Sequence, residues 1–425
     1  MQLVKTKFIF CIVFFLSSCF IGPVKELKFQ IEDSWDDSIS YASNPVPLNK
    51  LDNKFEINIL QKGFFDGLSR RNFKLLIDNQ NIFYISTNGI LSFYNLETNE
   101  YKDIYKHNIN ISSGISGNSK NLFFVDVDGY LCSFSFDHGL NWRTFVGEVF
   151  SPPILIFDRV VTKNTNNEFI ALNIIDGSVL WNYKLPTPPL SIRSWGPISS
   201  SDNVLFSGGP SGKIIAINSL NGSLIWETTF SQPRGSSEIE RSNDVTSEVA
   251  LDDYAVYGAS SNGNTSSLSK ADGSILWDRP LSSFAGLTLN EDNLFVTHSL
   301  GSIYNLSKIT NKIIWRNSSY TGRDTSKPIF FDNYIVVSDY EGWIHFLNKD
   351  DGLDQSRFKI AESTLLEPII SNDRLFFVSV NGEFNLLSLS NSIKVNEQNH
   401  DKNLDDKDLK SNNEDSIIDN LIFWD

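Results

Sequence analysis

The residue types that most often bind metal ions or act as nucleophiles are few in this sequence of 425 residues. Its five histidines are scattered along the chain and show none of the short spacings that bind zinc. One of its three cysteines, Cys132, lies in a strand-like alternation of apolar and polar residues over 130–134. A cysteine in that setting is expected to be a small buried hydrophobe and not a nucleophile. The sequence therefore predicts no metal site and no catalytic thiol.

Other chemistry is excluded by motif and by charge. No glycine-rich phosphate loop and no nucleophile elbow stands between a predicted strand and a predicted helix. The formal net charge is −15, and no basic patch occurs beyond the extreme N-terminus. Because phosphate binding needs clustered Lys and Arg, a nucleic-acid partner is not expected.

The N-terminus has the features of a targeting segment. Lys5 and Lys7 precede an apolar run over 8–16, which is too short to span a membrane, and Ser17 and Ser18 precede Cys19. This pattern resembles the bacterial lipoprotein signal. The resemblance implies a signal peptide over 1–18, lipid attachment at Cys19, and a place on the periplasmic side of the cell outer membrane. An ordinary secretory signal with an incidental cysteine is the alternative.

The elements that would position a site repeat along the chain. Tight turns that contain glycine separate β-rich apolar runs about every 40 residues, and these glycines are Gly89, Gly129, Gly212, Gly263, Gly301, Gly342 and Gly382. Glycine and asparagine supply the positive φ that tight hairpins need. The one double interval contains Asn166-Asn167-Glu168, which we interpret as a turn without glycine.

A second marker follows each turn by about a dozen residues. It is a polar turn, often Asp-Gly-Ser or Asn-Gly-Ser, that leads into a tryptophan: Trp142, Trp181, Trp226, Trp277 and Trp315. Several short strands in a period of about 40 residues are typical of propeller blades. We expect each tryptophan to pack between neighbouring blades, where a large ring buries much apolar area.

Counting these units predicts an all-β fold, an eight-bladed β-propeller of four-stranded blades. The units are centred over residues 73–99, 122–145, 157–184, 195–230, 247–281, 285–318, 327–360 and 366–390. The last unit has three strands, and residues 55–60 form an alternating strand without a blade of its own. An N-terminal strand in the last blade would close the ring and remove an exposed sheet edge.

The segments outside the ring differ in composition. We expect a lipid anchor and tether over 19–50, the propeller over 51–392, and an acidic, disordered tail over 393–425. The end of that tail, residues 417–424, is unexpectedly apolar.

The repeated Asp-Gly-Ser-x-x-Trp unit resembles the quinoprotein-dehydrogenase-like propeller repeat. Two groups with different functions share this repeat: quinone-dependent dehydrogenases, and the BamB-type lipoprotein subunit of the outer-membrane β-barrel assembly complex, which is not an enzyme. Once the turn at Asn166-Asn167-Glu168 is counted, the interval of 51 residues from Gly212 to Gly263 is the longest between neighbouring turns, and it holds a charged stretch over 231–245. This stretch is similar to the BamB-type loop pattern Pro-x-Gly-x-x-Glu-(Ile/Leu)-x-Arg-x-x-Asp-Val.

The resemblance to the BamB type implies a binding partner and the residues that contact it. The partner is the barrel-inserting subunit, bound through its periplasmic domain, and unfolded outer-membrane protein precursors are further candidate partners. The implied contacts are Leu190, Ile192, Arg193 and Asp244, and the implied loop-shaping residues are Arg234, Gly235, Glu238, Glu240 and Arg241. Thr246 stands where the family often has a second acid, so this charge is absent or moved to Glu248.

Other readings of these residues remain open. Leu190 and Ile192 could be buried between blades, and Arg193 and Asp244 could be solvated or could pair with each other. A quinone-dependent enzyme would need Ca²⁺ ligands and stacking groups, and related dehydrogenases carry adjacent cysteines, which this chain lacks. A ligand-binding periplasmic propeller is the third class. The sequence predicts a non-enzymatic scaffold without a cofactor.

Overall fold

The computed structural model describes residues 45–65, 75–78, 80–98, 100–118, 120–186, 196–232, 242–371 and 373–390. The chain divides into a unit of residues 1–45 and a unit of residues 46–425, and every assigned strand belongs to the second unit. No helix in the described part of the chain is long and apolar enough to cross a membrane.

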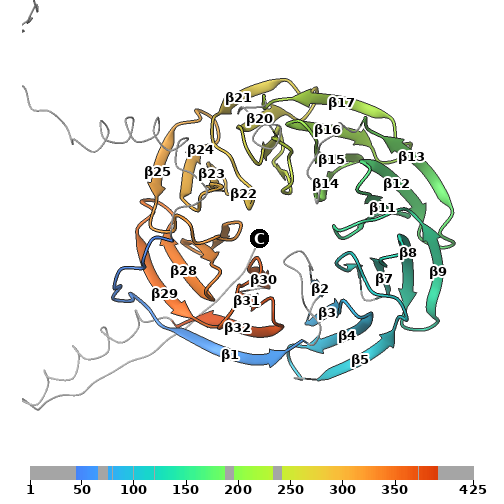
Figure 1. Ribbon diagram of the computed structural model, residues 1–425, viewed down its shortest axis with the longest axis horizontal. Helices are drawn as coiled ribbons and strands as arrows, with labels where there is room; N and C mark the ends of the chain where they lie inside the picture. The colour runs from blue at the N-terminus through green and yellow to red at the C-terminus, as the bar shows by residue number, and fades with distance from the viewer. Residues whose placement is uncertain are drawn as a thin grey trace, which may run out of the picture. The chain divides into compact units, whose positions relative to one another are not determined.

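The described strands form eight four-stranded antiparallel sheets, which are arranged as the blades of a ring (Figure 1). Blades one to four are β2 (Leu76–Asp78), β3 (Asn81–Ile85), β4 (Ile90–Asn95) and β5 (Tyr101–Lys106); β6 (Ser116–Gly117), β7 (Asn121–Val125), β8 (Tyr130–Ser135) and β9 (Gly139–Phe145); β10 (Ile154–Ile156), β11 (Arg159–Lys163), β12 (Glu168–Asn173) and β13 (Val179–Lys184); and β14 (Ile198–Ser201), β15 (Val204–Gly209), β16 (Lys213–Asn218) and β17 (Leu224–Thr229). The predicted all-β, eight-bladed propeller is confirmed.

The second half of the ring repeats this plan. Blades five to eight are β18 (Ala250–Leu251), β19 (Ala255–Ala259), β20 (Thr265–Ser269) and β21 (Ile275–Arg279); β22 (Gly286–Leu289), β23 (Asn293–Thr297), β24 (Ile303–Ser307) and β25 (Ile313–Asn317); β26 (Ile329–Phe331), β27 (Tyr334–Ser338), β28 (Trp343–Asn348) and β29 (Asp354–Lys359); and β30 (Ile369–Ser371), β31 (Arg374–Val378) and β32 (Glu383–Leu389) with β1 (Ile57–Phe64). The first strand of each blade lies near the centre of the ring and the last lies at its rim (Figure 1).

The ring closes through the N-terminal strand, as predicted. β1 pairs antiparallel with β32 from Ile57 opposite Leu389 to Phe64 opposite Glu383, so the eighth sheet runs in the order β1, β32, β31, β30. The last blade therefore joins two segments more than 300 residues apart in sequence, and ring closure leaves no blade without its outer strand.

The chain joins the propeller earlier than the predicted boundary at residue 51. Val46 N donates a hydrogen bond of 3.0 Å to Thr321 O, and Lys54 N donates one of 3.0 Å to Gln355 O in β29. Leu48 packs against the core between blades six and seven. Residues 46–50, assigned to the tether from sequence, thus lie on the propeller, because an apolar side chain and backbone hydrogen bonds hold them there.

The core lies between the blades. In β12 the four central residues are buried, whereas in β13, at the rim, only Trp181 is buried. Val161 and Phe169 of blade three pack with Leu205 and Ile215 of blade four in one apolar cluster. The middle strands of a blade are covered on both faces by the neighbouring blades, so consecutive residues are buried and burial does not alternate along them.

Each rim tryptophan contacts the next blade, which confirms the predicted packing. The indole Nε1 donates a hydrogen bond to a backbone carbonyl of the following blade, in the pairs Trp142–Ile174, Trp181–Ser219, Trp226–Lys270, Trp277–Lys308 and Trp315–Lys349. The glycine of the polar turn lies against the ring: a Cβ on Gly177 would stand 2.5 Å from Trp142 Cδ2. Blade six has Asn311 in place of that glycine, with φ 55°, and Arg279 donates a 3.0 Å hydrogen bond to its side chain.

Antiparallel strands divide the connections between two faces of the ring. One face, which we call the connection face, carries the turns between second and third strands, such as 209–212, and all the segments that join one blade to the next. The opposite face carries the other turns within blades, such as 157–158 and 174–178. In blade three the turn without glycine has Asn167 at φ 57°, as the interpretation of Asn166-Asn167-Glu168 requires.

Candidate functional site

The two connections singled out from the sequence are consecutive and lie on the connection face. The first joins β13 to β14 and the second joins β17 to β18. Leu190, Ile192 and Arg193 lie in the first, within residues that the structure does not describe. Arg234, Gly235, Glu238, Glu240 and Arg241 of the second lie outside the described residues as well, and so does Cys19. Of the predicted site residues, only Asp244 has a described environment.

The second connection is fastened at its base by residues on both sides of the undescribed stretch. Asn243 Nδ2 donates a hydrogen bond of 2.7 Å to Ser231 O. Ser231 Oγ in turn accepts a 3.0 Å hydrogen bond from Asn264 N and lies 2.9 Å from Ser260 Oγ. These contacts attach the two ends of the connection to each other and to the hairpin turn of blade five.

Asp244 is buried, with 2% of its surface exposed. Its Oδ1 accepts a 2.8 Å hydrogen bond from Ser211 N in the hairpin turn of blade four, and its backbone O accepts a 2.9 Å hydrogen bond from Ser261 N in blade five. This burial argues against the alternative in which Asp244 is a solvated surface acid, whereas the partner contact implied for Asp244 stays a prediction. The carboxylate instead caps a turn inside the ring, so its burial favours positioning the connection over touching a partner directly.

The segment that follows Asp244 passes close to blade four. A Cβ on Gly208 would lie 2.4 Å from Val245 Cγ1, and Val245 N donates a 3.0 Å hydrogen bond to Gly209 O. Only glycine at position 208 allows the connection to pass at this distance. Thr246, which replaces the second acid of the family pattern, is half-buried.

Glu248 does not supply the missing charge as an unpaired acid, because it pairs with a lysine. Its carboxylate lies 3.3 Å from Lys327 Nζ, which also lies 3.2 Å from Glu367. Burial acts to lower the pKa of Lys327, but Glu367 and Glu248 outweigh it and raise that pKa. The negative charge of Glu248 is therefore matched by a cation that links the connections before blades five, seven and eight.

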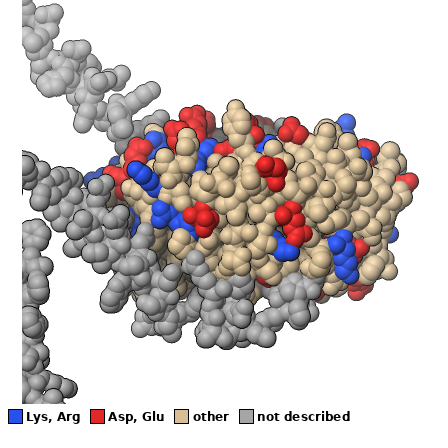
Figure 2. All heavy atoms as spheres, turned by 90° about the horizontal axis from the view of Figure 1, so that it is seen from above, with Lys and Arg blue, Asp and Glu red and all other residues tan. Residues whose placement is uncertain are grey.

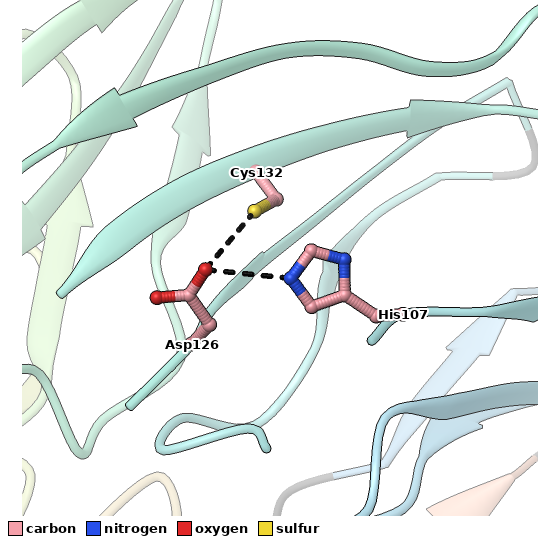
Figure 3. A group of neighbouring side chains, drawn as sticks. All are labelled: His107, Asp126 and Cys132. Carbon is pink, nitrogen blue, oxygen red and sulfur yellow. Dashed lines mark hydrogen bonds and ion pairs between the residues drawn. The ribbon is translucent and has the colours of Figure 1, made fainter. Parts of the chain in front are cut away.

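Elsewhere the fold brings together a group that the sequence spacing did not reveal: His107, Asp126 and Cys132 (Figure 3). Their potential ligand atoms lie within 4.8 Å of one another and all three residues are buried. Asp126 Oδ2 lies 3.3 Å from His107 Nε2 and 3.9 Å from Cys132 Sγ. Arg143 donates two hydrogen bonds to the same oxygen, at 3.0 and 2.8 Å, so a metal ion would have to displace a guanidinium group.

Blade seven repeats this arrangement with other residues. Asp339 Oδ2 accepts a 2.8 Å hydrogen bond from Arg323 and lies 3.1 Å from His345 Nε2, while its Oδ1 accepts one from Trp343 N. Asp126 Oδ1 accepts the equivalent bond from Tyr130 N. In both blades the aspartate caps the hairpin turn and nearby donors compensate its charge, which indicates a structural role.

Cys132 is fully buried, as predicted: it belongs to a hydrophobic core cluster, and Asp126 Oδ2 lies 3.9 Å from its Sγ. Burial, and then the negative charge of Asp126, raises the pKa of this thiol to about 12. Because the thiolate is the reactive form, Cys132 has the environment of an inert residue.

Charges on the outside of the ring are mixed. In Figure 2 the Lys and Arg side chains lie beside Asp and Glu side chains and form no continuous basic patch on that face. Lys213 pairs with Glu227, and Lys308 Nζ lies 3.0 Å from Asp252 Oδ2. Such a surface does not provide the clustered cations that a nucleic-acid backbone requires.

Comparison with known proteins identifies the family. A family model described as "Outer membrane protein assembly factor BamB" matches residues 98–317, which is 220 of the 425 residues. The chain belongs to the BamB family. The curated BamB of Yersinia pestis is 29% identical over 280 residues, covering 65% of this chain and 71% of that protein. The BamB of Burkholderia pseudomallei is 27% identical over 345 residues, covering 80% and 90% respectively.

Solved structures with the same fold include a BamB protein and dehydrogenases. The crystal structure of BamB from Moraxella catarrhalis superposes with a TM-score of 0.72 at 21% identity, covering 78% of this chain and 100% of that one. The quinohemoprotein alcohol dehydrogenase from Comamonas testosteroni also superposes, with a TM-score of 0.64 but only 8% identity over 84% of this chain and 83% of that one. The dehydrogenases thus share the propeller, whereas BamB proteins share both the propeller and the sequence. Membership of the BamB family places the chain with assembly factors and not with these enzymes, as predicted.

Proposed function

We propose that this chain is a non-enzymatic scaffold in outer-membrane protein assembly, and that it binds the periplasmic domain of the barrel-inserting subunit. The proposal is supported by two consecutive connections on the connection face of a BamB-family propeller. Buried hydrogen bonds hold the root of the first at Gly196 and the root of the second at Asn243 and Asp244. Connections on a rigid scaffold are where binding residues usually occur.

The docking surface consists of Leu190, Ile192 and Arg193 in the first connection, supported by the second. Two aliphatic side chains beside an arginine have the composition of an interface hot spot. Pro186, Pro188 and Pro189 precede them and reduce the conformational entropy that is lost on binding. In the second connection, Arg234, Gly235, Glu238, Glu240 and Arg241 maintain its shape, and Asp244 fixes its root.

Lipid at Cys19 holds the propeller on the periplasmic side of the outer membrane, because an anchor with several acyl chains binds a bilayer stably. Unfolded outer-membrane protein precursors are a second class of partner. Among the described strands, each rim strand pairs on one side only, and an extended segment could add a strand at its other edge.

The test is co-purification of the full chain with the inserting subunit from cells. The variant in which Leu190, Ile192 and Arg193 are all replaced by alanine should lose the inserting subunit while keeping its melting temperature. The matched control replaces Ile309 and Leu353 by alanine. These residues are 84% and 61% exposed on the opposite face, so the control should retain the inserting subunit. Equal recovery of the inserting subunit with both variants would refute the assigned face.

A further inference from the structure

Lys163 is a buried cation next to both connections. It is the last residue of β11 in blade three and is 3% exposed. Its Nζ reaches blade four, where it donates hydrogen bonds to the carbonyl oxygen of Gly208 and, at 3.3 Å, to Ser207 Oγ. Burying an ammonium group is costly unless it has such acceptors, so this position is expected to serve a purpose beyond packing.

The equivalent position in the other blades carries no charge. This position directly precedes the hairpin turn and pairs with the residue six further along the chain. Its occupants in blades one to eight are Ile85, Val125, Lys163, Gly208, Ala259, Thr297, Ser338 and Val378. Lys163 is therefore the exception among eight equivalents, and it binds the carbonyl oxygen of its own counterpart in the next blade.

Polar residues at this position hold the connection that leaves their blade. Thr297 Oγ1 donates a 2.8 Å hydrogen bond to Ser326 O, between blades six and seven. Ser338 Oγ donates a 3.1 Å hydrogen bond to Leu366 O, between blades seven and eight. In blade three, Lys163 contacts Ser207 Oγ, which itself donates a 3.3 Å hydrogen bond to Gly196 O at the end of the first connection.

Lys163 is coupled to the second connection as well. Burial lowers the pKa of Lys163 to about 8, and the negative charge of Asp244 opposes part of that fall. Asp244 is fixed on the hairpin turns of blades four and five. Gly208, whose carbonyl oxygen accepts the hydrogen bond from Lys163, also lies against the residue that follows Asp244: a Cβ on Gly208 would stand 2.4 Å from Val245 Cγ1. Through this contact Lys163 of blade three is joined to the root of the connection before blade five.

We propose that Lys163 is a positioning residue for the docking surface: through Ser207 and Asp244 it sets the roots of both connections relative to each other. The inference rests on the proposed function and extends it, because it names a residue that no partner would touch but on which the geometry of the surface depends. Neutralising Lys163 removes a positive charge that acts on Asp244, together with the contacts to Gly208 and Ser207. The positions of Gly196 and Asp244, at the roots of the two connections, are then no longer fixed relative to each other.

The test measures affinity for the purified periplasmic domain of the inserting subunit at pH 7. Lys163→Met, which keeps the length of the side chain, should weaken binding at least about fivefold, the lower end of couplings between separate sites. Asp244→Asn should also weaken binding. The double variant should bind no worse than Lys163→Met alone, because both single variants and the double variant interrupt the same coupling between Lys163 and Asp244. Lys270→Met is the control: Lys270 Nζ joins blades five and four through a 2.7 Å hydrogen bond to Ser201 Oγ on the opposite face.

Amide hydrogen exchange gives a readout that needs no partner. Lys163→Met should speed exchange at residues 196–198 and 242–246 and leave the equivalent residues 326–328 unchanged. A uniform increase in all blades would show general destabilisation and overturn the proposal. A second result would also overturn the proposal: Lys163→Met binds with wild-type affinity, although the variant with alanine at 190, 192 and 193 has lost binding. If that triple variant binds normally, the proposed function fails and this inference fails with it.

Discussion

Gly222 lies against the indole ring of Trp181, so closely that a Cβ atom at position 222 would stand 2.5 Å from Trp181 Cε3. The two residues belong to neighbouring blades, and Trp181 Nε1 also donates a 3.0 Å hydrogen bond to Ser219 O in the same turn. The Asn-Gly-Ser turn is thus both a local hairpin signal and one half of a contact between blades. This double role explains why the two sequence markers recur with the same period.

Gly222→Ala should destabilise the propeller by roughly 2–4 kcal/mol, because it adds a clash with Trp181 to the cost of a φ of +72°. The control is Gly139→Ala: Gly139 has φ +77°, but a Cβ there would meet nothing within 4 Å, so only the backbone cost of about 1–2 kcal/mol is expected. Urea denaturation of both variants measures the difference. Equal losses would show that the contact with the indole adds nothing.

Ring closure predicts a large effect from removing β1. Without residues 46–65, the apolar side chains that pack around Phe65, including Phe384, become exposed, and β32 loses its partner strand. The remaining chain should unfold at a lower temperature and with lower cooperativity in calorimetry. A chain that lacks 393–425 instead serves as the control and should melt as the full chain does. Unchanged melting of the first variant would contradict closure by β1.

The thiol of Cys132 should be unreactive in the folded protein. With its pKa raised to about 12, almost no thiolate exists at pH 8. In a chain that begins at residue 20, Cys132 is the single cysteine, and a chromogenic disulfide reagent should modify it only after urea is added. Rapid modification without urea would be inconsistent with this prediction. Added Co²⁺ should likewise produce no thiolate charge-transfer band, because Arg143 occupies Asp126.

Lys163 should make stability depend on pH in the alkaline range. Its pKa is about 8 in the folded state and near its usual value of about 10.4 when unfolded. Between these values the unfolded chain binds more protons, so folding stability rises with pH, by up to about 3 kcal/mol, relative to a protein without this group. The free energy of unfolding of the wild type minus that of Lys163→Met, measured from pH 7 to 10, should increase accordingly. A constant difference over that range would argue against a depressed pKa.

Lipid attachment at Cys19 predicts a change of fractionation. Cys19→Ser should leave the protein in the soluble periplasmic fraction, because it removes the residue that carries the proposed lipid anchor. Immunoblots of membrane and soluble fractions provide the measurement, and Cys132→Ser is the matched control that should remain with the membrane. Membrane retention of Cys19→Ser would point to another anchor.

The fold was predictable to a large extent because its signals are local. Glycine or asparagine at positive φ marks the hairpin between the second and third strands in seven of the eight blades, blade five with Gly263 being the exception. Residues 55–60 carry the alternation of a strand that lacks a blade of its own. Even Asn167, where glycine is missing, follows this rule. Family membership was readable for the same reason, since the repeat and the long connection are contiguous stretches of sequence.

The environment of single site residues was not predictable. The acid at position 244 reads as a surface group from sequence, because nothing near it in the chain indicates burial. It is buried because Ser211 and Ser261, in two different blades, close around it. Lys163 likewise has no local signal, and its acceptors lie more than 40 residues away in the next blade.

The sequence by itself therefore determined the eight-bladed ring, its seam and its family, since turns and strand periodicity depend on neighbouring residues. Only the tertiary structure decided that Asp244 is buried between two hairpin turns, that Lys163 binds Ser207 and Gly208 of the next blade, and that His107, Asp126 and Cys132 meet. Those outcomes depend on which residues of separate blades are packed together, and burial and charge compensation follow from that packing alone.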